Sequence, residues 1–144
     1  MTWERAAAAV SRAPLQAVWD VLLDGRRWSF WNPDVEWMWI EGEPVPGTVA
    51  TVKLKRVRQT AFVIEEIAPP HRFAIRVTVG PVARLRLTWM LTTHERGTRI
   101  ESIVAIDGVA AGFLLQRPAR RVAQAMPATL ERLAEYAARV PDAQ

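Results

Sequence analysis

The residues in this sequence best suited to proton transfer are two histidines and a set of carboxylates. His71 follows Pro69-Pro70, and His94 lies in the run Thr-His-Glu-Arg-Gly, so both are predicted to occupy exposed turns between strands. A general base must reach the proton of a bound substrate. Exposed turns therefore favour a structural role for both histidines over a catalytic one, and no serine lies in a nucleophile-elbow or Ser-His-Asp arrangement.

Five carboxylates lie on or beside predicted strands. A carboxyl group that points into an apolar cavity holds its proton more tightly than in water and could act as an acid or a base. Most surface acids are instead solvated or paired with arginine, as Glu101 could be with Arg99 or Arg86. The sequence leaves acid–base chemistry open without assigning it to any of Asp34, Glu36, Glu66, Glu101 and Asp107.

The aromatic residues are unusual because 7 of them are Trp, beside 4 Phe and 1 Tyr. Trp rarely disappears into a core, since its indole N–H needs a partner, and it often lines cavities or interfaces. Plain core packing is the alternative for each. Residues 34–40 are apolar on both faces, so the pattern does not say which face is inward. The predicted cavity-lining residues are Trp28, Trp31, Trp37, Trp39, Phe62, Trp89, Phe113, Met126 and Leu130.

Length and composition indicate one globular domain over residues 1–144, with 50% hydrophobic and 24% charged residues. The absence of cysteine excludes disulfides, thiol nucleophiles and zinc–thiolate sites. With 2 histidines, a histidine-rich metal site is also excluded, and we expect neither metal nor cofactor. No stretch approaches the roughly 18 apolar residues of a membrane span, and no signal peptide is evident. The expected location is the cytoplasm.

The net charge of +4 favours weak attraction to anions without identifying a nucleic-acid binder. The basic run 53–58 is interleaved by Leu54 and Val57 rather than by aromatic platforms, so we expect no nucleic-acid partner. Three arginines of the last predicted helix could meet an acidic protein or anionic lipid headgroups, although a solvated helix face explains them more simply. These arginines are Arg117, Arg120 and Arg121.

Hydrophobic periodicity predicts an α+β chain with short connections. Two features stand out in the long C-terminal helix: an apolar face repeating every three or four residues, and Pro118 and Pro127, which should kink or split it. A curved antiparallel sheet of seven strands would wrap around this helix, leaving a natural ligand cavity between them. The predicted strands are 2–12, 34–41, 48–57, 60–68, 72–79, 83–93 and 98–107, and the predicted helices are 14–23, 26–31 and, after a bend at 108–112, the segment up to about residue 140.

Six groups of residues follow one another along the chain in a characteristic order and spacing. They are Ala13-Pro14 with Val18-Trp19, Trp28 with Trp31-Asn32-Pro33 and Val35, Gly42 with Gly47-Thr48, Glu66 with Pro69-Pro70-His71-Arg72-Phe73, Gly97-Thr98-Arg99-Ile100-Glu101, and Leu130 with Leu133. With them, the chain resembles the helix-grip fold of the START and birch-pollen-allergen group, SRPBCC, and within it the polyketide cyclase/dehydratase family. The resemblance covers roughly residues 3–140. It implies a deep apolar cavity for a lipid, sterol, polyketide or similar molecule, with no universal catalytic residue to carry over.

Three functions remain in competition. The leading hypothesis is a binder of a hydrophobic small molecule, acting as a monomer or homodimer. The second is a cyclase, aromatase or dehydratase, which requires a polar pair inside the cavity; the single tyrosine, Tyr136, lies near the chain end. The third is a protein-interaction module, which predicts a large exposed apolar patch.

Overall fold

The computed structural model describes residues 3–55, 59–79, 83–108 and 116–140. The predicted α+β helix-grip fold is confirmed, with a 3₁₀ turn and a short α-helix in place of the second predicted helix. The elements are β1 (Trp3–Ser11), α1 (Leu15–Leu23), η1 (Gly25–Arg27), α2 (Trp28–Trp31), β2 (Val35–Ile40), β3 (Val49–Leu54), β4 (Thr60–Ala68), β5 (Arg72–Val79), β6 (Ala83–His94), β7 (Gly97–Asp107) and α4 (Gln116–Arg139).

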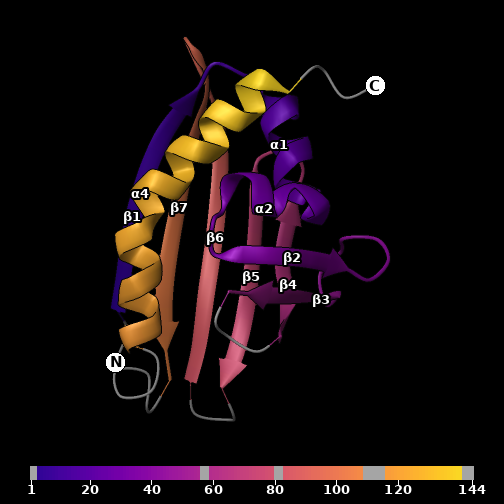
Figure 1. Ribbon diagram of the computed structural model, residues 1–144, viewed down its shortest axis with the longest axis vertical. Coiled ribbons are helices and arrows are strands. Elements are labelled where there is room, and N and C mark those ends of the chain that lie inside the picture. Colours follow the sequence, from indigo (N-terminus) through magenta and orange to yellow (C-terminus); the bar gives the residue numbers. More distant parts are fainter. Residues whose placement is uncertain (1–2, 56–58, 80–82, 109–115, 141–144) are drawn as a thin grey trace.

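The strands form a seven-stranded sheet in the order β1-β7-β6-β5-β4-β3-β2. Strands β2 to β7 are an antiparallel meander, and β1 closes the order by pairing with β7. The register shifts in β2 between Val35 and Trp37 and in β4 between Ile64 and Glu66. Such bulges bend strands, and β2 and β3 cross in front of β4 and β5 (Figure 1). The sheet therefore curls and presents a concave inner face.

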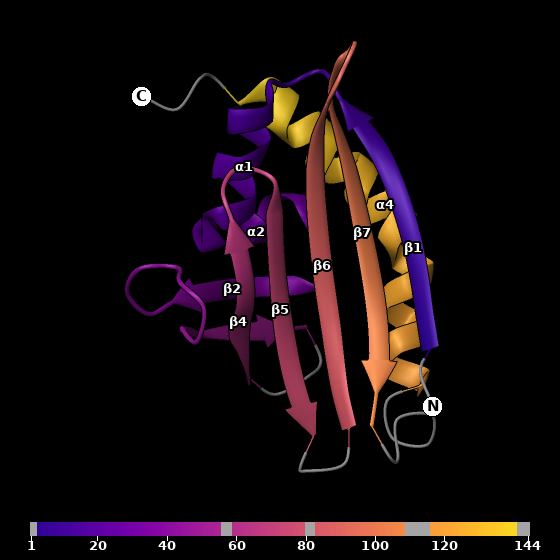
Figure 2. The same cartoon turned by 180° about the vertical axis from the view of Figure 1, so that it is seen from behind.

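The described helices lie on that inner face, and none of them covers the outer face (Figures 1 and 2). α4 runs as one helix past Pro127, so the predicted split does not occur. Pro127 is exposed, whereas its neighbour Met126 and, one turn on, Leu130 are buried against the sheet, and this packing holds the helix together. Pro118 lies in the first turn, where a missing N–H is harmless.

Hydrogen bonds secure the end of the molecule where β1 leads into α1. Ser11 Oγ donates to the carbonyl of Ala134 on α4 at 2.7 Å and accepts from the Ala13 N–H at 3.1 Å. Thr98 Oγ1 on β7 donates to the Ala13 carbonyl at 2.9 Å. Gly97 has φ 140° and lies so close to this turn that a Cβ would stand 2.8 Å from Arg12 C. Buried polar bonds thus join the sheet and α4 at this end.

Candidate functional site between the sheet and helix α4

One end of the interior is filled by stacked and edge-on aromatic rings, which we call the aromatic end (Trp19, Trp28, Trp31, Phe73 and Trp89). The Trp28 ring centroid lies 5.1 Å from that of Trp31 and 5.5 Å from that of Trp89. Phe73 stacks on Trp89 at 5.7 Å and meets Trp19 edge-on at 6.5 Å. α2 brings Trp28 and Trp31 to one side because they are three residues apart. All five side chains are buried.

The other end of the inner face is lined by aliphatic side chains, which we call the aliphatic end (Val77, Leu85 and Leu87). They come from β5 and β6, the same strands that supply Phe73 and Trp89, yet each is only partly buried. Leu85 and Leu87 lie on β6, which runs between β5 and β7, so their exposure does not arise at a sheet edge. Leu87 packs against both hydrophobic clusters formed by the described residues. Accessible apolar surface therefore remains on the inner face.

Six of the nine predicted cavity residues lie in the buried interior, and two do not. Trp37 and Trp39 are 42% and 59% exposed. The bulge at Val35 and Trp37 explains this, because it turns Val35 and Met38 inward and leaves both tryptophans on the exposed side of β2. Phe113 lies outside the described residues. The six buried residues are Trp28, Trp31, Phe62, Trp89, Met126 and Leu130.

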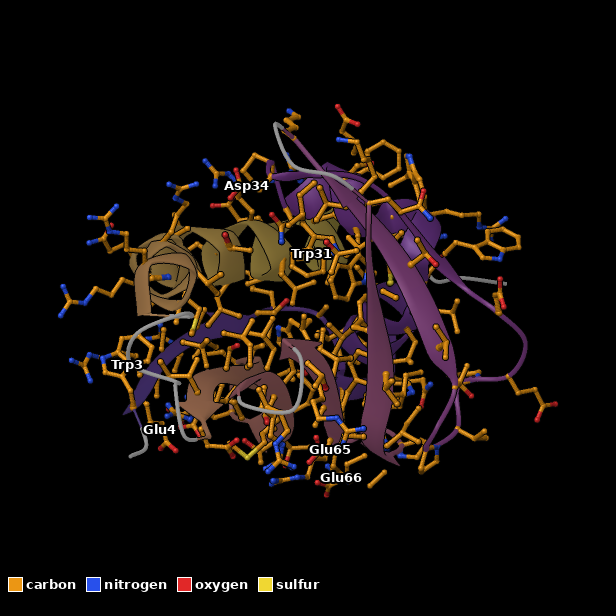
Figure 3. All side chains as sticks on the ribbon, turned by 90° about the horizontal axis from the view of Figure 1, so that it is seen from below. Trp3, Glu4, Trp31, Asp34, Glu65 and Glu66 are labelled. Atoms are coloured by element: carbon orange, nitrogen blue, oxygen red, sulfur yellow. The ribbon has the colours of Figure 1, made fainter. Side chains whose placement is uncertain are left out.

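The carboxylates considered as acids or bases lie away from the interior. Glu66 Oε1 is 2.8 Å from Arg72 Nε, Asp107 Oδ1 is 3.3 Å from Arg84 Nε, and Glu101 Oε2 is 3.1 Å from Arg99 Nη2. Figure 3 places Glu65 and Glu66 on the outer side of the sheet, far from Trp31. Of the remaining two, Glu36 lies 3.4 Å from Lys53 and Asp34 is exposed.

The interior holds a polar atom that the sequence pattern did not single out. The indole Nε1 of Trp31 is buried and has no hydrogen-bond partner, and the residue is 1% exposed. Its neighbour Trp28 donates from Nε1 to the Leu22 carbonyl at 2.8 Å. Ser102 is also buried on the inner face, opposite Trp89 in the β6–β7 register. The strict alternation of Ile100, Ser102, Val104 and Ile106 in β7 could have identified this inward hydroxyl.

A separate small pocket of about 220 Å³ lies between η1 and the β2–β3 connection. η1 packs tightly on β2 here, since a Cβ on Gly25 would stand 2.7 Å from the Met38 carbonyl oxygen. Asp24 is already engaged by Arg26 and Arg27 at 3.3 Å. The pocket is lined by Leu23, Asp24, Gly25, Arg26, Met38, Trp39, Ile40, Gly42 and Pro44.

Two kinds of site are not found in the part of the chain that the structure describes. Within these residues, no three His, Asp or Glu side chains are grouped so that they could hold a metal ion. No described helix combines the length and apolarity needed to cross a bilayer.

Comparison with known proteins agrees with this architecture. The family described as "Polyketide cyclase / dehydrase and lipid transport" matches residues 3–138. No curated protein sequence matches the chain.

Among solved structures, Ara h 8.0201 superposes with a TM-score of 0.70 at 16% identity, covering 95% of this chain and 98% of that one. The di-domain ARO/CYC protein BexL from the BE-7585A biosynthetic pathway gives 0.71 at 22% identity and 97% coverage, and the present chain spans about half (51%) of it. The Polyketide_cyc-like protein Cgl2372 from Corynebacterium glutamicum gives 0.68 at 18% identity, covering 94% of this chain and 91% of that one. At these identities the structures establish the shared fold.

Proposed function

Because the chain belongs to the polyketide cyclase/dehydrase and lipid transport family, we propose that it binds an apolar small molecule between the sheet and α4. The observation that carries this proposal is the accessible aliphatic surface of Val77, Leu85 and Leu87 on the inner face of central strands. Burying apolar surface contributes about 25 cal/mol per Å² before the cost of association. A ligand lying along the aliphatic end would gain this term.

The polar groups of the interior support binding ahead of catalysis. A cyclase or dehydratase needs positioned groups that accept and return protons. The carboxylates considered for that task face arginine or lysine on the outer side or are exposed. Two of the inward hydroxyls, those of Ser11 and Thr98, donate to backbone carbonyls. An apolar host with few polar contacts fits this arrangement.

The exposed side chains of Trp37, Trp39 and Val49 favour a second candidate, a protein-interaction surface on the outer side of β2 and β3. Trp37 and Trp39 pair in register with Lys53 and Thr51, so they share one face of the two strands. This function predicts that loss of the two tryptophans changes association with a protein and leaves an interior ligand unaffected.

The test measures binding of an apolar probe before and after a larger side chain is introduced at the proposed site. Wild-type protein is titrated with N-phenyl-1-naphthylamine, an uncharged apolar fluorophore, and we expect saturable fluorescence enhancement. Leu87→Trp adds an indole to the aliphatic end. It should lower the affinity for the probe by about tenfold or more, and tenfold is equivalent to about 1.4 kcal/mol. The matched control is Thr92→Trp, which places the same side chain on the exposed opposite face of β6.

Unchanged probe affinity in folded Leu87→Trp, or no probe binding to the wild-type protein, would contradict the proposal. Circular dichroism confirms that each variant keeps the wild-type fold before its affinity is compared.

A further inference from the structure

We propose that Trp31 donates a hydrogen bond from Nε1 to an uncharged acceptor oxygen of the bound molecule. The ligand would then be an apolar compound that carries a carbonyl or similar acceptor, rather than a pure hydrocarbon. This inference rests on the proposed function and specifies the class of ligand. Figure 3 shows Trp31 in the interior, between α4 and the curled sheet.

The unpartnered donor is exceptional within its own surroundings. Buried polar groups almost always find a partner, and each exception requires an explanation. The ring centroid of Trp28, in the same helix, lies 5.1 Å from that of Trp31, and the Trp28 N–H donates to the Leu22 carbonyl. The local chain thus supplies an acceptor to one indole and none to the other.

A second buried and unpartnered indole nitrogen, Trp3 Nε1, provides a contrast. Trp3 begins β1, is only partly buried, and has the Arg5 guanidinium 4.7 Å above its ring. Part of Trp3 is therefore in contact with water. Trp31 is 1% exposed, so water is not available to it in the same way. Trp31 is therefore the donor that a ligand would satisfy.

The charge of the interior restricts the acceptor. The buried polar residues among those described are Ser11, Thr88, Thr98 and Ser102, and none of them carries a charge. An ionised group placed there would lose its hydration without gaining a counter-ion, which is strongly unfavourable. A neutral oxygen avoids that cost while accepting the indole N–H. Any charged group of the ligand would remain in contact with water, outside the aromatic end.

A short series of packed side chains separates the accessible aliphatic end from the donor. Leu87 and Trp89 are successive inward positions of β6, about 7 Å apart along a strand. Trp89 meets Trp28 at 5.5 Å, and Trp28 meets Trp31 at 5.1 Å. Because Nε1 has almost no accessible surface in this structure, we expect a side-chain rotation at the aromatic end to accompany binding.

The experiment compares two probes of nearly equal shape, 2-acetylnaphthalene and 2-isopropenylnaphthalene, which differ by an oxygen in place of a methylene. Their affinities are measured by displacement of N-phenyl-1-naphthylamine. The ketone-to-alkene affinity ratio should fall about five- to tenfold in Trp31→Phe, because the substitution removes the N–H and keeps an aromatic ring. Trp28→Phe is the matched control, since its N–H is occupied by Leu22, and it should leave the ratio unchanged.

An NMR measurement on the wild-type protein covers the case in which Trp31→Phe does not fold. With ¹⁵N-labelled tryptophan, the Trp31 indole proton should move downfield with the ketone and stay in place with the alkene. An equal ratio in wild type and Trp31→Phe, or equal shifts with both probes, would overturn this inference and leave the proposed function standing. If neither probe binds, the proposed function fails as well.

Discussion

The two ends of the interior share strands β5 and β6 but are packed differently. At the aromatic end, Phe73 and Trp89 are buried beneath α1 and α2, whereas at the aliphatic end Val77, Leu85 and Leu87 keep accessible surface. The difference follows from the helices, because α1 and α2 lie over one end only (Figure 1). A single sheet thus carries a tightly packed region and a loosely covered region, and we propose that the ligand binds at the second.

The largest expected effect tests whether the aromatic end carries the stability. Trp89→Ala removes a ring that contacts both Phe73 and Trp28 and should lower the free energy of unfolding by about 3–5 kcal/mol. Leu87→Ala, two residues along the same strand, should cost only about 1–2 kcal/mol because its side chain is already partly exposed. Urea unfolding followed by circular dichroism measures both. Equal losses would remove the distinction between the two ends.

A smaller effect is expected at the polar contacts beside α1. Ser11→Ala deletes the bond from Oγ to Ala134 on α4 and leaves a buried carbonyl without that donor. The free energy of unfolding should fall by about 1–2 kcal/mol. Ser29→Ala, at an exposed position, is the control and should change it by less than about 0.5 kcal/mol.

The affinity of the same variant for the apolar probe gives a second measurement. Ser11→Ala should leave binding of N-phenyl-1-naphthylamine within about twofold of wild type, a change of about 0.4 kcal/mol. A large loss of affinity without a loss of stability would show that this end also shapes the binding site.

Most of the fold could be predicted from the alternation of apolar and polar residues and from the positions of proline and glycine. β4 and β5 begin and end at the predicted residues 60–68 and 72–79, since Pro69-Pro70 separates two clean strands. The apolar face of α4 predicted that Met126 and Leu130 would pack on the sheet, and both are buried. The sequence left a kink or a split at Pro127 open, and the helix is continuous because tertiary packing on either side outweighs the local cost of proline.

The candidate site was predictable only where one face of a strand is clearly polar. Trp89 sits on the apolar face of β6, opposite an arginine-rich face, so its inward direction could be inferred. The segment 34–40 has no such contrast between its two faces, and a bulge at Val35 and Trp37 determines which of its side chains point inward. The unpartnered N–H of Trp31 depends on where backbone carbonyls fall in three dimensions, and no sequence pattern encodes that.

The smallest expected effects concern the exposed tryptophans of β2, which lie outside the comparison of the two ends. Trp39→Ser should change the free energy of unfolding by less than about 0.5 kcal/mol, because the side chain is 59% exposed. Affinity for N-phenyl-1-naphthylamine, measured by fluorescence, should be unchanged.

Trp37→Ser provides the control that separates three possible sites for the probe. Trp37 is exposed on the same strand, but only Trp39 lines the pocket between η1 and the β2–β3 connection. Weaker binding in Trp39→Ser alone would assign the probe to that pocket, and weaker binding in both variants would assign it to the outer side of β2. Unchanged binding in both, together with its loss in Leu87→Trp, would leave the interior as the site, because neither exposed ring contributes to it.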